Sequence, residues 1–326
     1  MKFNNIDELI KNKNWKDDFK QFKDISDPTQ LQISFDPKWM SIHPVVVSMI
    51  SALGIEVLRK NPGVSKNISL TAHVKMETQL KKSNLFNILN IPSEEIKSEL
   101  AGRMIPVTQI KDASRLTEII QELVPLLHSP PKQADAIKYV MSEMIRNVLE
   151  HSKSPDGALL CAQYSKTSNR ISIGIADTGV GLFDALSQYH SPKNEMEAIK
   201  LALTPGITGT TSRVGGTEYN AGAGLFFTKS IAKVSNNFFI IYSGNSLFRL
   251  KKDKKGSNDT NLNPNPMDDN CSLKSNLNYW QGTVVGFDIS LESESEFQEL
   301  LKQIRDVYFL DLKTKTKSHY KKPKFT

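Results

Sequence analysis

Apolar positions in the first hundred residues change between the spacing of strands and the spacing of helices. The segment LQISF alternates apolar and polar residues, whereas PVVVSMISALGIEVL has the length and wide apolar face of a buried helix. The pattern predicts four elements: a strand over 31–35, a helix over 44–59, a strand over 67–74 and a helix over 76–89. This order is typical of a small α/β unit, so we expect an N-terminal segment over 1–28 and a small α/β domain over 29–100.

The chain from 101 to 311 continues with a longer series of strands and helices, which we expect to form a second domain. The pattern predicts strands over 104–110, 158–165, 170–177, 237–244 and 279–291, and helices over 114–128, 134–151, 223–235 and 297–310. Between Gly181 and Gly222 the sequence is rich in glycine and threonine, and we expect irregular structure there.

Two polar segments interrupt or follow this series. Residues 251–278 contain almost no apolar side chains and cannot bury enough surface to offset the ordering of the backbone, so we expect a mobile insertion between paired strands. Residues 312–326 hold six lysines and no acidic residue, which predicts a basic flexible tail. These lysines account for nearly all of the net charge of +7. We therefore expect no nucleic-acid partner for the body of the protein, and contact of the tail with RNA, DNA or an acidic protein stays open.

The composition adds an expected compartment. Cys161 and Cys271 have no metal-site spacing and form no disulfide framework, which suits a reducing compartment. The N-terminus lacks the apolar core of a signal peptide, and the apolar helix that contains Glu56 is too short to span a bilayer. We expect a cytoplasmic protein without a membrane partner.

The helix sequence SEMIRNVLEHS carries the first candidate chemistry. Glu143 and Asn147 are four residues apart and therefore share one helix face. An amide oxygen at Asn147 suits a magnesium ion that also contacts phosphate oxygens, because Mg²⁺ keeps several waters and takes few protein groups. Glu143 suits a base that orients a water or accepts a proton. An exposed polar helix face is the alternative.

The sequence IADTGVG places an acid at the end of an apolar strand. Asp177 there can accept a hydrogen bond from the exocyclic amine of adenine, and Gly179 and Gly181 let the backbone approach a ligand closely. In NAGAGLFFTKS, Gly222 and Gly224 precede a helix N-terminus, whose free N–H groups favour phosphate. An ordinary Asp-Thr-Gly turn and an ordinary helix start are the alternatives.

A strand that begins Gly282-Thr283 completes the set. The hydroxyl of Thr283 can bond a ring nitrogen of adenine, or a water between adenine and the acid at the end of the preceding apolar strand. An ordinary strand threonine is the alternative. The order of the four features resembles the GHKL superfamily, the histidine-kinase-like ATPases, over residues 134–290. The helix motif is most similar to the anti-sigma-factor type.

The resemblance implies a Bergerat fold, which is an α/β sandwich of a mixed sheet with helices on one face, and ATP and Mg²⁺ as cofactors. By position it makes Glu143 the general base and Asn147 the metal ligand. It assigns nucleotide contacts to the remaining site residues: Asp177, Gly179, Gly181, Gly222, Gly224, Leu225 and Thr283. Residues 204–221 correspond to the lid over the nucleotide, where Arg213 is either a phosphate contact or a solvated side chain. The long lid and the insertion depart from the family pattern.

Two functions remain open. In the first, binding of Mg-ATP orders the lid and controls domain or partner interactions, with slow hydrolysis, in a regulatory protein with a protein partner or as a homodimer. In the second, the protein is an anti-sigma-type serine/threonine kinase. A histidine kinase is not expected, because no histidine precedes an acid and a nearby proline on a dimerising helix. The segment 29–100 resembles a STAS-type domain, in which Ser41 stands near a phosphorylation position but is better explained as a helix cap.

Overall fold

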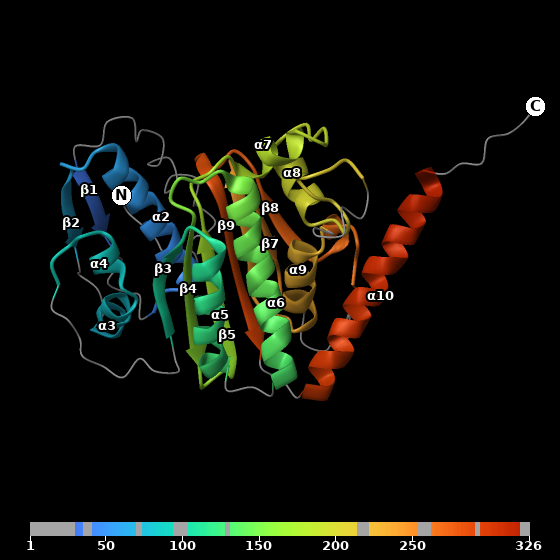
Figure 1. Cartoon of the computed structure of the whole chain (residues 1–326), viewed down its shortest axis with the longest axis horizontal. Helices are drawn as coiled ribbons and strands as arrows, with labels where there is room; N and C mark the ends of the chain where they lie inside the picture. The colour runs from blue at the N-terminus through green and yellow to red at the C-terminus, as the bar shows by residue number, and fades with distance from the viewer. Residues whose placement is uncertain are drawn as a thin grey trace, which may run out of the picture.

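The structure is a computed structural model of the chain. It describes residues 30–34, 41–69, 74–93, 104–127, 131–213, 222–252, 262–290 and 294–319. Figure 1 shows a large sheet covered by helices, with a smaller sheet at the N-terminal end and a long helix at the opposite end. The N-terminal segment 1–28 lies outside the described residues. No helix in the described ranges combines the length and apolar character that crossing a membrane requires.

The large sheet has seven strands, and each pair of neighbours within it is antiparallel. In spatial order the strands are β3 (Met104–Ile110), β4 (Ala158–Ser165), β5 (Arg170–Ala176), β9 (Trp280–Ser290), β6 (Phe239–Gly244), β7 (Ser246–Leu250) and β8 (Cys271–Lys274). The expected mixture of parallel and antiparallel strands is therefore wrong. Neighbouring strands β4–β5 and β6–β7 follow each other through short turns, and β9 enters between β5 and β6 running against both.

One face of the sheet is covered by helices that share an apolar core with it. They are α5 (Ala113–Leu127), α6 (Pro131–Asn147) and α9 (Gly224–Val234), with α10 (Glu294–His319) packed against α6 and α9. The core between these layers includes fully buried Ile145, Phe226 and Phe287. The short helices α7 (Gly181–Ser187) and α8 (Glu195–Ala202) lie beside β6 and were missed, because their sequences are rich in small and polar residues.

The opposite face of the sheet is covered by α2 (Pro44–Lys60), so helices lie on both faces rather than on one as expected. The other side of α2 carries a parallel pair, β1 (Gln30–Ser34) and β2 (Ser65–Ser69), with α3 (Val74–Lys82) and α4 (Leu85–Ile88). Burial against two layers explains the wide apolar face of α2. The two expected domains consequently share a core, which joins residues such as Val47 and Leu80 to Leu159 and Val284.

The N-terminal end of α2 approaches the sheet at two glycines. Gly174 and Gly286 are directly paired on β5 and β9, and a Cβ on Gly174 would lie 2.2 Å from the Cα of Val45. The hydroxyl of Ser48 donates to the carbonyl of Gly174 at 2.9 Å. His43 caps the helix, since its Nδ1 accepts from the amide of Val45. The sequence suggested Ser41 as the cap of this helix, and that prediction is wrong.

The polar segment expected to be mobile is partly ordered. Residues 262–278 form a short 3₁₀ turn and β8, while 253–261 lie outside the described residues. The carboxylate of Asp269 is buried between two amino groups, at 2.5 Å from Lys229 Nζ and 2.7 Å from Lys233 Nζ. Composition could not predict this buried ion pair, because the lysines that partner Asp269 lie on a helix far from it in the sequence.

A helix extends into the range that was expected to form a flexible tail from residue 312. The helix α10 continues to His319, and residues 320–326 lie outside the described part of the chain. Lys315 contacts the body of the protein by donating from Nζ to the carbonyl of Pro205 at 3.3 Å. A contact with a segment 110 residues away explains why local composition misplaced the end of this helix.

Replacing Gly174 with alanine should destabilise the protein, because the new methyl group overlaps the backbone of α2 and the helix must shift. Overpacking of this kind typically costs about 1–3 kcal/mol. Urea denaturation followed by circular dichroism measures the free energy of unfolding. Gly63→Ala is the matched control, since its Cβ would have only Asn61 Oδ1 nearby, at 3.7 Å. Equal stability of the two variants would contradict this account of α2 packing.

Candidate functional site

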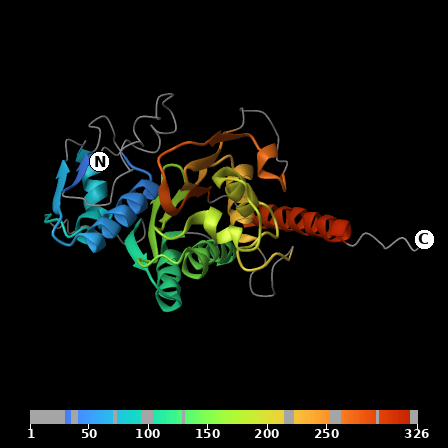
Figure 2. The same ribbon diagram turned by 90° about the horizontal axis from the view of Figure 1, so that it is seen from above.

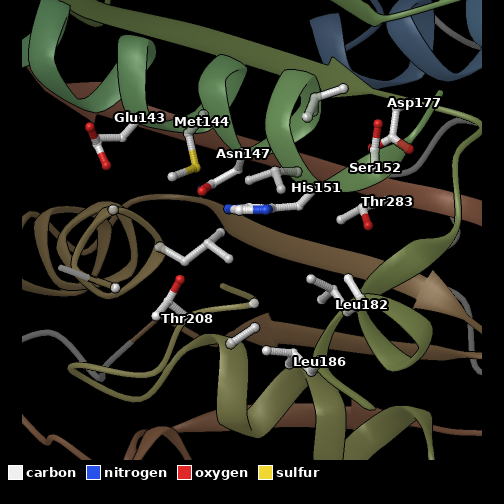
Figure 3. Close-up of a pocket in the computed structure, with 18 of the residues that line it drawn as sticks. Glu143, Met144, Asn147, His151, Ser152, Asp177, Leu182, Leu186, Thr208 and Thr283 are labelled. Atoms are coloured by element: carbon white, nitrogen blue, oxygen red, sulfur yellow. The ribbon is translucent and has the colours of Figure 1, made fainter. Parts of the chain in front are cut away.

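A cavity opens at the end of the sheet where β5 and β9 meet the helix layer (Figure 3). It encloses about 900 Å³ of space, counting the part that is open to solvent. Its walls come from the end of α6, the start of β9, α7, the loop after α8 and the start of α9. The lining includes eight of the nine residues predicted from the sequence: Glu143, Asn147, Asp177, Gly181, Gly222, Gly224, Leu225 and Thr283.

The helix wall ends in an unusual turn. The α-helix stops at Asn147, and Val148–Ser152 form a turn of π-helix, a widened geometry that is frequent at functional sites. Glu143 and Asn147 both line the cavity. Burial raises the pKa of Glu143, even though Arg146 donates to its Oε1 at 2.9 Å and opposes that shift. The raised pKa makes this carboxylate a better proton acceptor than an exposed glutamate.

His151 is a cavity residue that the sequence analysis did not select. It follows Asn147 by four residues, and this spacing was the available signal. Figure 3 shows its ring directed toward the side chain of Asn147. Burial lowers the pKa of His151, so the imidazole is neutral at physiological pH and presents one N–H donor and one acceptor nitrogen.

The strand wall ends in a buried acid. Asp177 is 1% exposed, and its Oδ1 accepts from the amide of Gly179 at 2.8 Å. Its Oδ2 has no hydrogen-bond partner among the described residues. Burial without a countercharge raises the pKa of Asp177 to about 7, although hydrogen bonds from the backbone of Gly179 and Thr283 lower it. The cavity therefore contains an unsatisfied oxygen that suits a ligand with an N–H group.

Side chains from β6 and β9 hold the turn that carries this acid. Trp280 Nε1 donates to the carbonyl of Asp177 at 3.0 Å, and Ser243 Oγ donates to the carbonyl of Gly282 at 2.8 Å. Ser243 Oγ also accepts from the amide of Leu182 at 2.9 Å. Gly282 has φ +103°, where a side chain would be strained. Neither Trp280 nor Ser243 could be identified from local sequence, because each acts on a segment far along the chain.

Gly179 is the predicted site residue that does not line the cavity. A Cβ at this position would lie 2.0 Å from the carbonyl oxygen of Ser152. The amide of the next residue, Val180, donates to that same carbonyl at 2.7 Å. Gly179 therefore lets the acid-bearing turn pack against the π-turn, and it shapes the site from behind.

The two glycines before α9 serve different purposes. Gly222 has φ +64°, and its carbonyl accepts from the amide of Gly206, which joins the two ends of the expected lid. A Cβ on Gly224 would lie 2.9 Å from the Cβ of Glu143, so this glycine allows α9 to approach α6. The N-terminus of α9 consequently lies next to the predicted base, where its free N–H groups favour an anion.

The expected lid is described up to Arg213, and residues 214–221 lie outside the described range. Thr208 in this loop lines the cavity, and its carbonyl accepts from His190 Nε2 at 2.9 Å. Arg213 is exposed, which agrees with the solvated alternative for this side chain.

The side chains of the cavity could hold a metal ion only if a bound ligand supplied further oxygen donors. Among the described residues no group of three or more His, Cys, Asp or Glu side chains is placed to hold a metal. Asn147 offers a single amide oxygen beside Glu143. This is compatible with Mg²⁺, which takes one or two protein groups and completes its shell with phosphate oxygens and water.

Asp177→Asn should change the pH dependence of stability. The carboxyl group ionises near 3.8 in the unfolded chain and at about 7 in the folded protein, so the folded state holds the extra proton between these values. The wild-type protein then loses stability as pH rises through this window, by at most about 4 kcal/mol. Thermal unfolding at pH 4 and pH 8 should show that the variant gains stability relative to the wild type only at the higher pH. A difference that is independent of pH would contradict the shifted pKa.

No protein-family model matches this chain, and no curated protein matches it.

Proposed function

We propose that the cavity binds ATP together with Mg²⁺ and that nucleotide binding controls how this regulatory protein interacts with a partner or a second copy. The observation that carries the proposal is the buried carboxylate of Asp177, which lines the same cavity as Asn147 and Glu143 and whose Oδ2 has no hydrogen-bond partner in the described part of the chain. The GHKL-like order of these residues along the chain agrees with it.

The acid end of the cavity fits adenine. The exocyclic amine of adenine supplies an N–H donor for Asp177 Oδ2, and Thr283 lies beside it with a hydroxyl that bonds a ring nitrogen or a water. Guanine has a carbonyl at the corresponding position, which would place two acceptors against each other. A buried unpaired acceptor is costly, so this contact discriminates strongly between the two bases.

The opposite end of the cavity fits the triphosphate. Asn147 would hold the metal ion, while the start of α9 at Gly224 and Leu225 supplies free backbone N–H groups. The magnesium ion would bridge phosphate oxygens and reduce their mutual repulsion. His151 lies between these two ends and can donate a hydrogen bond to the ligand from a neutral ring.

One contact favours slow turnover, as expected of a switch. The carboxylate of Glu143 already accepts from Arg146 Nη1 at 2.9 Å, so one of its oxygens is engaged in an ion pair. A switch needs ATP to bind one conformation more tightly than another, and turnover then only resets it.

The second candidate is a serine/threonine kinase in which Glu143 accepts the proton of the attacking hydroxyl group. The raised pKa of Glu143 favours this alternative. In that reaction the hydroxyl oxygen forms a bond to the γ-phosphorus while the bond to the β,γ-bridging oxygen breaks and ADP leaves. Transfer of labelled γ-phosphate to a protein rather than to water would identify the kinase.

Asp177→Asn should weaken ATP binding by roughly 10- to 100-fold, because the amide replaces an acceptor with a donor that faces the adenine amine. Isothermal titration calorimetry with ATP and with GTP measures the dissociation constants. Asp184→Asn is the control, since Asp184 is an exposed acid on α7. Unchanged ATP affinity in Asp177→Asn would remove the basis of the adenine assignment.

Glu143→Gln should leave ATP affinity within a few-fold of the wild type and reduce turnover by about 10²-fold or more, since the general base is lost. Phosphate release under single-turnover conditions measures the chemical step. Glu150→Gln is the matched control, because Glu150 is exposed about two turns after Glu143 and lies 3.9 Å from the same Arg146. Persistent turnover in Glu143→Gln would place the base elsewhere.

A further inference from the structure

The long C-terminal helix reaches the loop that forms one wall of the cavity. Lys315 on α10 donates from Nζ to the carbonyl of Pro205 at 3.3 Å and lies 2.5 Å from Asp311 Oδ2 one turn earlier on the same helix. The side chain of Lys315 is 30% exposed and that of Asp311 is 15% exposed. This pair is therefore partly shielded from water, unlike an ordinary surface ion pair.

Pro205 stands where α8 ends and the cavity wall begins. Gly206 follows Pro205, and the three residues after it all line the cavity: Ile207, Thr208 and Gly209. Gly206 is held by the carbonyl of Gly222, and Ile207 donates to the carbonyl of Thr204.

The helix that carries Lys315 has a firm base. Leu301, Ile304 and Tyr308 are buried, and the ring of Tyr308 lies 6.3 Å from Phe226 and 6.0 Å from Phe227 on α9. The helix α9 begins at Gly224, which lines the cavity on its other side. Figure 1 shows α10 crossing the end of the molecule from this contact toward its C-terminus. The same helix thus contacts both α9 and the loop around Pro205.

We infer that Lys315 is a positioning residue for the nucleotide cavity: it holds the Pro205 carbonyl and thereby fixes the wall formed by Ile207, Thr208 and Gly209. The inference rests on the proposed function for its effect on ATP. By linkage, a ligand that needs this wall in place also favours the docked position of α10. Anything that displaces the C-terminal part of α10 therefore lowers the affinity for that ligand.

The test compares Lys315→Met with Lys313→Met, because Lys313 is an exposed lysine two residues earlier on the same helix. We expect a fluorescent ATP analogue to dissociate roughly three- to tenfold faster from Lys315→Met, the size of effect that corresponds to the net contribution of one typical intramolecular hydrogen bond. Lys313→Met should match the wild type, and thermal unfolding should show both variants folded. Equal dissociation rates in the two variants would overturn the inference.

A second measurement separates this inference from the proposed function. Hydrogen exchange of the amides of Gly206 and Ile207 is followed in the protein without nucleotide, where Lys315→Met should speed exchange and Lys313→Met should not. If the wild type fails to bind ATP but this exchange still responds to Lys315→Met, the proposed function is wrong and the positioning role stands. If exchange is unchanged, Lys315 does not hold the loop, whatever the cavity binds.

Discussion

The site depends on keeping one carboxylate out of water at the end of β5. Asp177 is nearly inaccessible and no charged side chain of the described residues compensates it, so its ionised form is unfavourable. Within the described part of the chain, hydrogen bonds from the backbone of Gly179 and Thr283 stabilise that form. The surrounding structure holds this arrangement through Trp280, which bonds the carbonyl of Asp177 itself. Burying this carboxylate costs folding stability, and under the proposed function it serves to recognise the nucleotide.

The packing of both sheet faces explains why the end of the sheet is the place for such a site. On one face α6 and α9 approach each other closely at Gly224, and on the other α2 rests on Gly174 and Gly286. Figure 2 shows the N-terminal unit and α10 at opposite ends of the same body. Both faces are thus filled, and the open space lies where β5 and β9 reach the turns before α7 and α9.

The sequence predicted most of the strands, and nearly all of the site residues selected from it line the cavity, because both depend on short-range patterns. β4 agrees with its expected bounds, and the expected acid and amide line one cavity. The direction of the strands, the second face of the sheet and the anchoring of Asp269 depend on contacts between distant segments, which no local pattern records. Gly179 shows the limit within a motif, since a glycine needed for close approach looks the same whether it faces a ligand or the backbone of Ser152.

The π-turn at the end of α6 has a consequence for how this region tolerates change. Successive residues of an α-helix point about 100° apart, so the extra residue accommodated by Val148–Ser152 sets the direction in which the following side chains point. Deleting one residue there would change the winding and therefore the direction of the imidazole of His151 relative to Asn147. The number of residues in this stretch thus matters for the site as well as their identity, whereas substitutions that preserve the winding leave the ring where it is.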